Sequence, residues 1–252
     1  MGILDGKVAI VTGAGQGTGR GIALALAKEG SSIAVAGRTL WKCARTAEEA
    51  KDVGGRALPV AFLAGRREQA DALVAATIKE FGTVDILVNS AQDTRPGVSF
   101  EDTTDEDMAL ALDSGLWGTF HLMQACFRYL KERGGKIINL ASAAGIEGME
   151  GFAAYAAAKE GIRALTRVAA REWAKYGVTV NVICPFADAP AQRAWAKAHP
   201  DEMARNVAKV PMGRLGDCER DIGRAVVFLA SSDSDYITGH SIMVDGGQAI
   251  LR

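Results

Sequence analysis

The chain has 252 residues, 48% of them hydrophobic and 23% charged, so it can bury one substantial core. A formal net charge of −1, with both signs interspersed, argues against a nucleic-acid-binding protein. We expect one cytoplasmic domain over residues 1–252 without a metal or a membrane partner, because the sequence contains no apolar run of membrane-spanning length and its cysteines and histidines lack metal-ligand spacing.

The first predicted strand, residues 7–12, leads into a glycine-rich turn, T-G-A-G-Q-G-T-G, and then into a helical pattern that ends near Gly30. A strand, a glycine turn and a helix in this order favour dinucleotide binding, with the phosphates at the helix N-terminus. Gly13 would permit the tight turn, Gly17 would let the backbone approach the pyrophosphate, and Gly19 would let the helix pack closely on the sheet.

The second predicted strand, residues 32–37, ends where the cofactor type is decided. Gly37 stands where an acidic residue would bind the adenosine ribose, and Arg38 and Thr39 follow it. A guanidinium beside the ribose can pair with a 2′-phosphate, so we expect NADP(H) to be favoured over NAD(H). The alternative is an arginine that stacks on adenine without phosphate selectivity, and the neutral Gln16 weakens the case for NADP(H).

Further strands are predicted at residues 56–62, 84–89, 135–141, 178–184 and 241–245, and the longest helices at 103–133 and 152–176. The alternation predicts an α/β fold of Rossmann type: a doubly wound, seven-stranded parallel sheet with helices on both faces. Its binding crevice lies at the carboxyl ends of the strands, and the sequence places Gly13, Asn89, Ser142 and Pro185 there.

Ser142, Tyr155 and Lys159 form a candidate proton-transfer set. Tyr155 and Lys159 are four residues apart, so they share one face of a helix, and Ser142 follows the apolar strand before it. A nearby cation favours the phenolate, so we expect Lys159 to lower the pKa of Tyr155 and make it a usable acid or base. The Ser142 hydroxyl could hydrogen-bond a substrate oxygen. By itself the pair also fits a half-buried tyrosine beside a solvated lysine.

Residues 186–200 depart from the regular alternation, and they resemble the mobile substrate lid of the enzyme family named below, which implies a lid at about 186–214. An ordinary surface helix is the alternative. Gln92, Met149, Phe186 and Trp195 would line or cover the substrate pocket, which suggests a mainly apolar wall with one amide and an uncharged alcohol or ketone as the substrate.

Five motifs in this order resemble the short-chain dehydrogenase/reductase superfamily over essentially the whole chain. They are T-G-x-x-x-G-x-G, D-I-L-V-N-S-A at 85–91, S…Y-x-x-x-K, N-V-I-C-P at 181–185 and Y-I-T-G-H-S-I-M-V-D-G-G at 236–247. The resemblance implies an NADP(H)-dependent oxidoreductase that interconverts a ketone and a secondary alcohol, with Tyr155 as general acid/base. It also implies a set of cofactor-binding residues: Gly13, Gln16, Gly17, Thr18, Gly19, Arg38, Thr39, Asn89, Ala91, Tyr155, Lys159 and Pro185.

Several positions depart from the family pattern. Gly115 stands where members usually have an asparagine that holds a water for the lysine, although a glycine could kink the helix and free a carbonyl for that water. The other departures are Thr18, Leu63, Ser90, Gln92, Phe186 and Pro190. Phe186 and Pro190 keep an alternative open, a non-redox lyase, isomerase or cyclase, or a binding subunit with weakened nucleotide binding.

The resemblance further implies a homotetramer. The helices that carry residues 109–127 and 152–176 are apolar around more of their circumference than a surface helix needs, which suggests a buried second face. We also expect Ile250 and Leu251 to pack on a neighbouring subunit. The alternative is that these helices pack only within the monomer and the tail frays.

Overall fold

A computed structural model describes residues 2–250 and has a seven-stranded parallel sheet at its centre. The strands are β1 (Val8–Thr12), β2 (Ser32–Gly37), β3 (Ala57–Ala61), β4 (Ile86–Asn89), β5 (Lys136–Leu140), β6 (Thr179–Pro185) and β7 (Ser241–Val244). They lie in the order β3-β2-β1-β4-β5-β6-β7, and every neighbouring pair is parallel. The predicted Rossmann-type sheet is confirmed, and all seven predicted strands are present.

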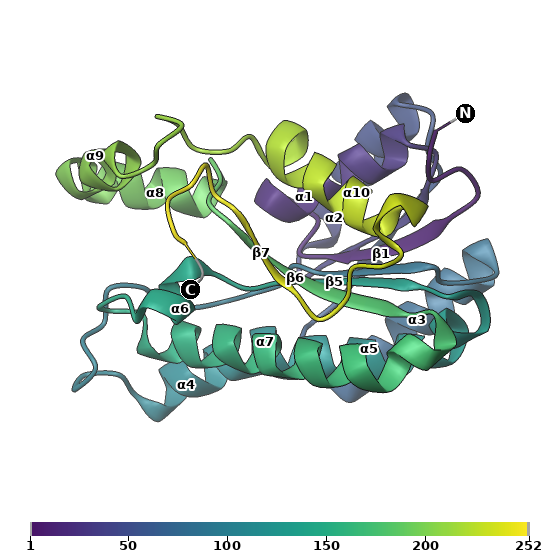
Figure 1. The fold of residues 1–252 in the computed structure, drawn as a ribbon, viewed down its shortest axis with the longest axis horizontal. Helices are drawn as coiled ribbons and strands as arrows, with labels where there is room; N and C mark the ends of the chain where they lie inside the picture. The colour runs from purple at the N-terminus through teal and green to yellow at the C-terminus, as the bar shows by residue number, and fades with distance from the viewer. Residues whose placement is uncertain (1, 251–252) are drawn as a thin grey trace.

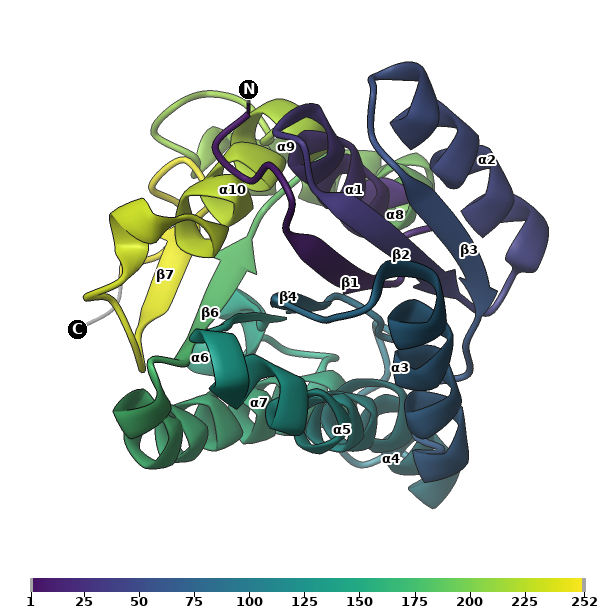
Figure 2. The same ribbon diagram turned by 90° about the vertical axis from the view of Figure 1, so that its right-hand side faces the viewer.

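Helices cover both faces of the sheet, as Figures 1 and 2 show. One face carries α1 (Gly17–Lys28), α2 (Leu40–Asp52) and α10 (Arg224–Ala230), and the other carries α3 (Arg67–Phe81), α5 (Gly118–Arg133) and α7 (Ala153–Trp173). Each layer buries its apolar side chains against the sheet, which gives one core on either side of it. None of the helices in residues 2–250 combines the length and apolarity needed to span a membrane.

The single long helix expected over residues 103–133 is interrupted. It begins as α4 (Asp105–Ala111), where Thr104 and Asp107 form a capping box, and it widens into the π-helical turn η1 (Leu112–Trp117) before it continues as α5. The departure from α-helical geometry includes Gly115, the position at which the sequence allowed a kink in the helix. The other predicted long helix is α7, extended by the short 3₁₀ turn η2 (Ala174–Tyr176).

Three further helices lie at the carboxyl ends of the strands: α6 (Ala143–Glu147), α8 (Pro190–Ala198) and α9 (Pro200–Ala208). The short turns η3 (Cys218–Gly223) and η4 (Ser232–Ser234) flank α10. Chain order reverses between β1 and β4, because β2 and β3 lie on one side of β1 and β4 to β7 on the other. A parallel sheet opens a crevice at such a switch point.

Candidate active site

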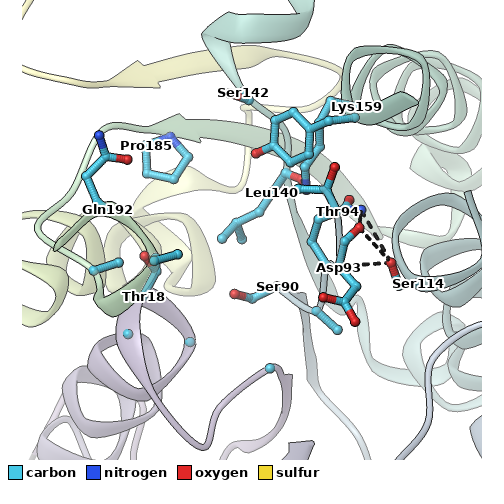
Figure 3. A pocket seen from close by; sticks show the side chains of 18 of the residues that line it. Thr18, Ser90, Asp93, Thr94, Ser114, Leu140, Ser142, Lys159, Pro185 and Gln192 are labelled. Atoms are coloured by element: carbon cyan, nitrogen blue, oxygen red, sulfur yellow. Dashed lines mark hydrogen bonds between the residues drawn. The ribbon is translucent and has the colours of Figure 1, made fainter. Parts of the chain in front are cut away.

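A cavity of about 730 Å³ opens at this edge of the sheet. Its wall combines the glycine turn after β1, the segment after β4, the end of β5, the start of α7 and the segment after β6. Figure 3 shows Thr18, Ser90, Ser142, Lys159 and Gln192 around this space. The sequence motifs therefore meet in one site, although they are spread over most of the chain.

The glycine turn forms a cradle at the N-terminus of α1. Gly13 and Gly17 have φ angles of 65° and 57°, in the left-handed region that favours glycine. A Cβ atom on Gly19 would lie 2.4 Å from the carbonyl oxygen of Gly13, so no larger residue fits there. The open turn and the helix N-terminus together fit the pyrophosphate of a dinucleotide.

The far end of the cavity, beside β2 and α2, is rich in cations. Arg38, Thr39 and Lys42 line it, and the Arg38 guanidinium forms an ion pair with Asp93. The Lys42 ammonium donates a hydrogen bond of 2.7 Å to Oε1 of Gln16. Lys42 therefore places a positive charge beside the neutral Gln16 on the cavity wall, and the sequence analysis did not name this residue. Its position in the first turn of α2, soon after Arg38 and Thr39, could have indicated it.

Ser142, Tyr155 and Lys159 all line the cavity, as the sequence predicted. Ser142 caps α6, where its Oγ accepts a hydrogen bond of 3.2 Å from the Ala144 amide. Lys159 is buried, donates 2.8 Å to the carbonyl oxygen of Leu140, and has its Nζ 5.3 Å from the centroid of the Tyr155 ring. The helix α7 thus places the Tyr155 phenol and the Lys159 amine in the same cavity as the Ser142 hydroxyl at the end of β5.

The proton affinities differ from the sequence prediction. Burial raises the pKa of Tyr155, and a contact with the Ser142 side chain only partly offsets that shift. Burial also lowers the pKa of Lys159 from 10.5 to about 8. The expected lowering of the Tyr155 pKa is therefore not found, because burial outweighs the effect of its neighbours. The phenol holds its proton more firmly than a tyrosine in water.

The other predicted cofactor residues lie on the cavity wall, with one exception. Gly13, Gln16, Gly17, Thr18, Gly19, Ala91 and Pro185 line the cavity. Asn89 does not: it is 4% exposed, and its Nδ2 donates 2.8 Å to Oδ1 of Asn139 on the neighbouring strand. The structure therefore gives Asn89 a place inside the sheet and leaves the cavity wall to the residues after it.

The four predicted substrate residues line the cavity as well. Trp195 on α8 stacks on His199 at 3.9 Å between centroids and approaches Phe152 at 6.5 Å. A Cβ atom on Gly97 would lie 3.4 Å from the Trp195 ring, so α8 reaches across to the loop after β4. Phe152 is a further aromatic residue of this wall that the sequence analysis did not name.

Gln92 contributes less polarity than expected. Its Nε2 donates to the backbone carbonyl oxygens of Asp93 and Ala111, at 2.8 and 3.1 Å. The amide nitrogen is thus engaged by the protein and is not free to bind a substrate. Within residues 2–250, no group of histidine, cysteine, aspartate and glutamate side chains could hold a metal ion.

Comparison with known proteins decides the family. A family model described as enoyl-(acyl carrier protein) reductase matches residues 13–249. The chain belongs to the short-chain dehydrogenase/reductase family. It is 42% identical to a 12α-hydroxysteroid dehydrogenase from a Clostridium species, over 98% of both chains. It is 38% identical to the 3-oxoacyl-acyl-carrier-protein reductase FabG of Vibrio cholerae, over 98% of this chain and 99% of that protein.

Solved structures of the short-chain dehydrogenase/reductase family agree with the fold. An NAD⁺-bound xylitol dehydrogenase superimposes with a TM-score of 0.90 at 31% identity, over 97% of this chain and 99% of that one. As a short-chain dehydrogenase/reductase, the protein is an oxidoreductase that uses a nicotinamide cofactor and a small-molecule substrate.

Proposed function

We propose that the protein is an NADP(H)-dependent oxidoreductase that interconverts a ketone and a secondary alcohol. The observation that carries the proposal is that one cavity holds both the glycine cradle and the set Ser142, Tyr155 and Lys159. The relatives are named as dehydrogenases and reductases, so they do not favour a non-redox function or a binding subunit.

The cofactor would lie along the crevice. Its pyrophosphate would sit on Gly17, Thr18 and the N-terminus of α1, with its adenosine end toward Arg38 and Lys42. When bound, the nicotinamide accepts or supplies the hydride. Lys159 donates only one hydrogen bond within residues 2–250, to Leu140, so two of its three N–H groups are free to bind a ribose hydroxyl and a proton-carrying group.

Three side chains of the chain would handle the substrate oxygen. The Ser142 hydroxyl donates a hydrogen bond to this oxygen and orients it. Tyr155 gives its phenolic proton to the oxygen in the reduction and takes it back in the oxidation. Its raised pKa keeps the phenol protonated at neutral pH, which favours carbonyl reduction there. The Lys159 ammonium stabilises the phenolate that is left when the proton has moved.

The preference for NADP(H) rests on two cations and a missing carboxylate. Arg38 and Lys42 flank the adenosine end, and Gly37 ends β2 where a carboxylate would repel a 2′-phosphate. Leu63 adds an apolar surface at the same end and is 51% exposed. The Asp93 carboxylate would have to release Arg38 for the guanidinium to meet the phosphate.

The substrate we propose is a bulky, mainly apolar alcohol or ketone, such as an alicyclic or steroid-like compound. Met149, Phe152, Phe186 and Trp195 form an apolar wall beside Tyr155, and the 42% identical relative is named for a hydroxysteroid. We also propose that the segment 186–214 acts as the lid of the same domain. The segment starts directly after β6. Its Pro190 lies beside the glycine turn, 3.1 Å from where a Cβ atom on Gly17 would be, and its Trp195 lies across the cavity.

The test of this function is a panel of carbonyl compounds followed by the absorbance of reduced nicotinamide. It should contain an oxo-steroid, a 3-oxoacyl thioester, a ketose and simple cyclic ketones, each with NADPH and with NADH. We expect turnover with NADPH to be fastest for the alicyclic ketones. No turnover with any compound, together with no saturable nucleotide binding by fluorescence, would contradict the proposal.

A further inference from the structure

Gln92 joins two segments that are separate in the sequence. Its Nε2 donates to the carbonyl oxygen of Asp93, in the loop after β4, and to that of Ala111, at the end of α4. Both partners are acceptors, so the orientation of the amide is fixed: the nitrogen faces them and Oε1 points the other way. Oε1 is buried and has no hydrogen-bond partner among the described residues.

That oxygen lies against Gly115. A Cβ atom at position 115 would come within 2.2 Å of Gln92 Oε1 and 2.9 Å of its Cδ. Gly115 does not have a positive φ, so its backbone conformation would accept an alanine or an asparagine. A side chain at position 115 would therefore displace the Gln92 carboxamide from its hydrogen bonds, without straining the backbone of position 115.

The two contacts act on the cavity wall. Residues Ser90 to Thr94 and Pro96 line the cavity, and this wall begins beside Gly13 of the glycine cradle. Ser114 ties the same wall to the π-helical turn, since its Oγ accepts 2.8 Å from the Asp93 amide, and Figure 3 shows these bonds. Gln92 is the only side chain of this wall, within residues 2–250, that donates a hydrogen bond to the carbonyl oxygen of Ala111.

We propose that Gln92 is a positioning residue whose carboxamide fills the space of the side chain missing at Gly115 and fixes the cavity wall after β4 against the π-helical turn. Only the activity measurement in its test rests on the proposed function; the stability measurement does not. The proposal makes positions 92 and 115 a coupled pair: the carboxamide at 92 keeps its hydrogen bonds only with glycine at 115, and a carboxamide at 115 fits best with a small residue at 92.

The experiment is a double-mutant cycle of Gln92→Ala and Gly115→Asn. Each single variant should lower the melting temperature by at least ~4 °C and kcat/KM for the ketone by at least ~10-fold, because each removes the hydrogen bonds of the Gln92 amide to Asp93, Ala111 and Ser114. The double variant should recover at least half of both losses, since an asparagine at 115 then has the vacated space. Gly115→Ala replaces Gly115→Asn if the latter does not fold; paired with Gln92→Ala it should recover the melting temperature.

Two readouts separate positioning from a general loss of structure. In all variants kcat should fall by a larger factor than the Kd for NADPH rises, because Gln92 does not contact Gly17 or Lys42, which would hold the nucleotide. The control pair, Gly115→Asn with Gln124→Ala on α5, should be additive. Additive losses in the main cycle, or a Gly115→Asn variant with unchanged melting temperature, would overturn the proposal. The melting temperatures decide it even if no substrate is found, an outcome that would count against the function alone.

Discussion

Among single residues, Lys159 lowers the free energy of unfolding because its charged ammonium is buried, and the size of this effect depends on pH. Burial lowers the pKa of its ammonium to about 8 in the folded chain, whereas an unfolded lysine keeps a pKa near ~10.4. Below pH 8 the folded state holds a buried charge, and between about pH 8 and ~10 it loses the proton while the unfolded state keeps it. The contribution of Lys159 to the free energy of unfolding therefore rises across that window.

We predict that Lys159→Met, without nucleotide, is more stable than the wild type at pH 7 by up to ~3 kcal/mol. The difference should shrink toward zero by pH ~10, because the wild-type amine is then neutral in the folded state. Urea denaturation of both proteins at several pH values measures it. A difference that stays constant with pH would show that Lys159 does not titrate in this range.

Arg38 and Lys42 carry the prediction about the cofactor. Replacing either by alanine should raise the Kd for NADPH by at least ~10-fold, because a charge-assisted contact to the 2′-phosphate is lost, and should leave the Kd for NADH within ~2-fold. Arg45→Ala is the matched control, since Arg45 lies on α2 but faces Glu49 instead of the cavity. A wild type that already prefers NADH would refute the role of both cations. Gly37→Asp tests this less cleanly, because its Cβ would lie 3.0 Å from the Cys43 sulfur.

Among the elements, we expect α8 to limit the size of the substrate that the cavity can hold. Trp195 rests on Gly97 and faces Phe152, so Trp195→Ala should remove the outer apolar wall. For a bulky ketone we expect KM to rise by ~10-fold or more, with the Kd for NADPH little changed. Phe100→Ala is the control, because Phe100 is 86% exposed and does not line the cavity. Equal effects of the two variants would argue for α8 as an ordinary surface helix.

The elements also show how far the sequence could be interpreted. The strands were predictable because each is a short apolar run between turn signals, and the glycine cradle was predictable because its φ angles demand glycine. The π-helical turn and the place of Asn89 were not, since both depend on contacts between segments that are distant in the sequence. Gly115 was recognised as an anomaly, but its cause, the Gln92 side chain, appears only when the loop after β4 and the helix are packed together.

At the scale of the whole molecule, α5 and α7 present an apolar outer face. The two helices lie next to each other below the sheet in Figure 1. Phe127 of α5 stacks on Trp173 of α7 at 4.3 Å between centroids, and Val168 of α7 is 55% exposed. A face of this kind fits an isologous contact with a second copy. Ile250 is 80% exposed, as a tail that binds a neighbouring subunit would be, and Leu251 lies outside the described residues.

We therefore predict a homotetramer, with one of its two interfaces formed by α5 and α7. Light scattering at micromolar concentration should return four times the chain mass of 26.5 kDa. Val168→Glu should reduce the measured mass to that of a dimer, because a buried unpaired charge opposes the interface formed by α5 and α7. Glu172→Gln on the same helix is a control that adds no charge to the face. A monomer mass for the wild type would refute the assembly.

Tyr155→Phe tests whether Tyr155 transfers the proton in a nicotinamide-dependent carbonyl reduction. This variant keeps the ring and its contacts with Phe152 and removes only the hydroxyl. With the best ketone of the panel, the account predicts a kcat at least ~10²-fold below the wild type and a Kd for NADPH within ~2-fold of it. Near-wild-type turnover in this variant would contradict the account.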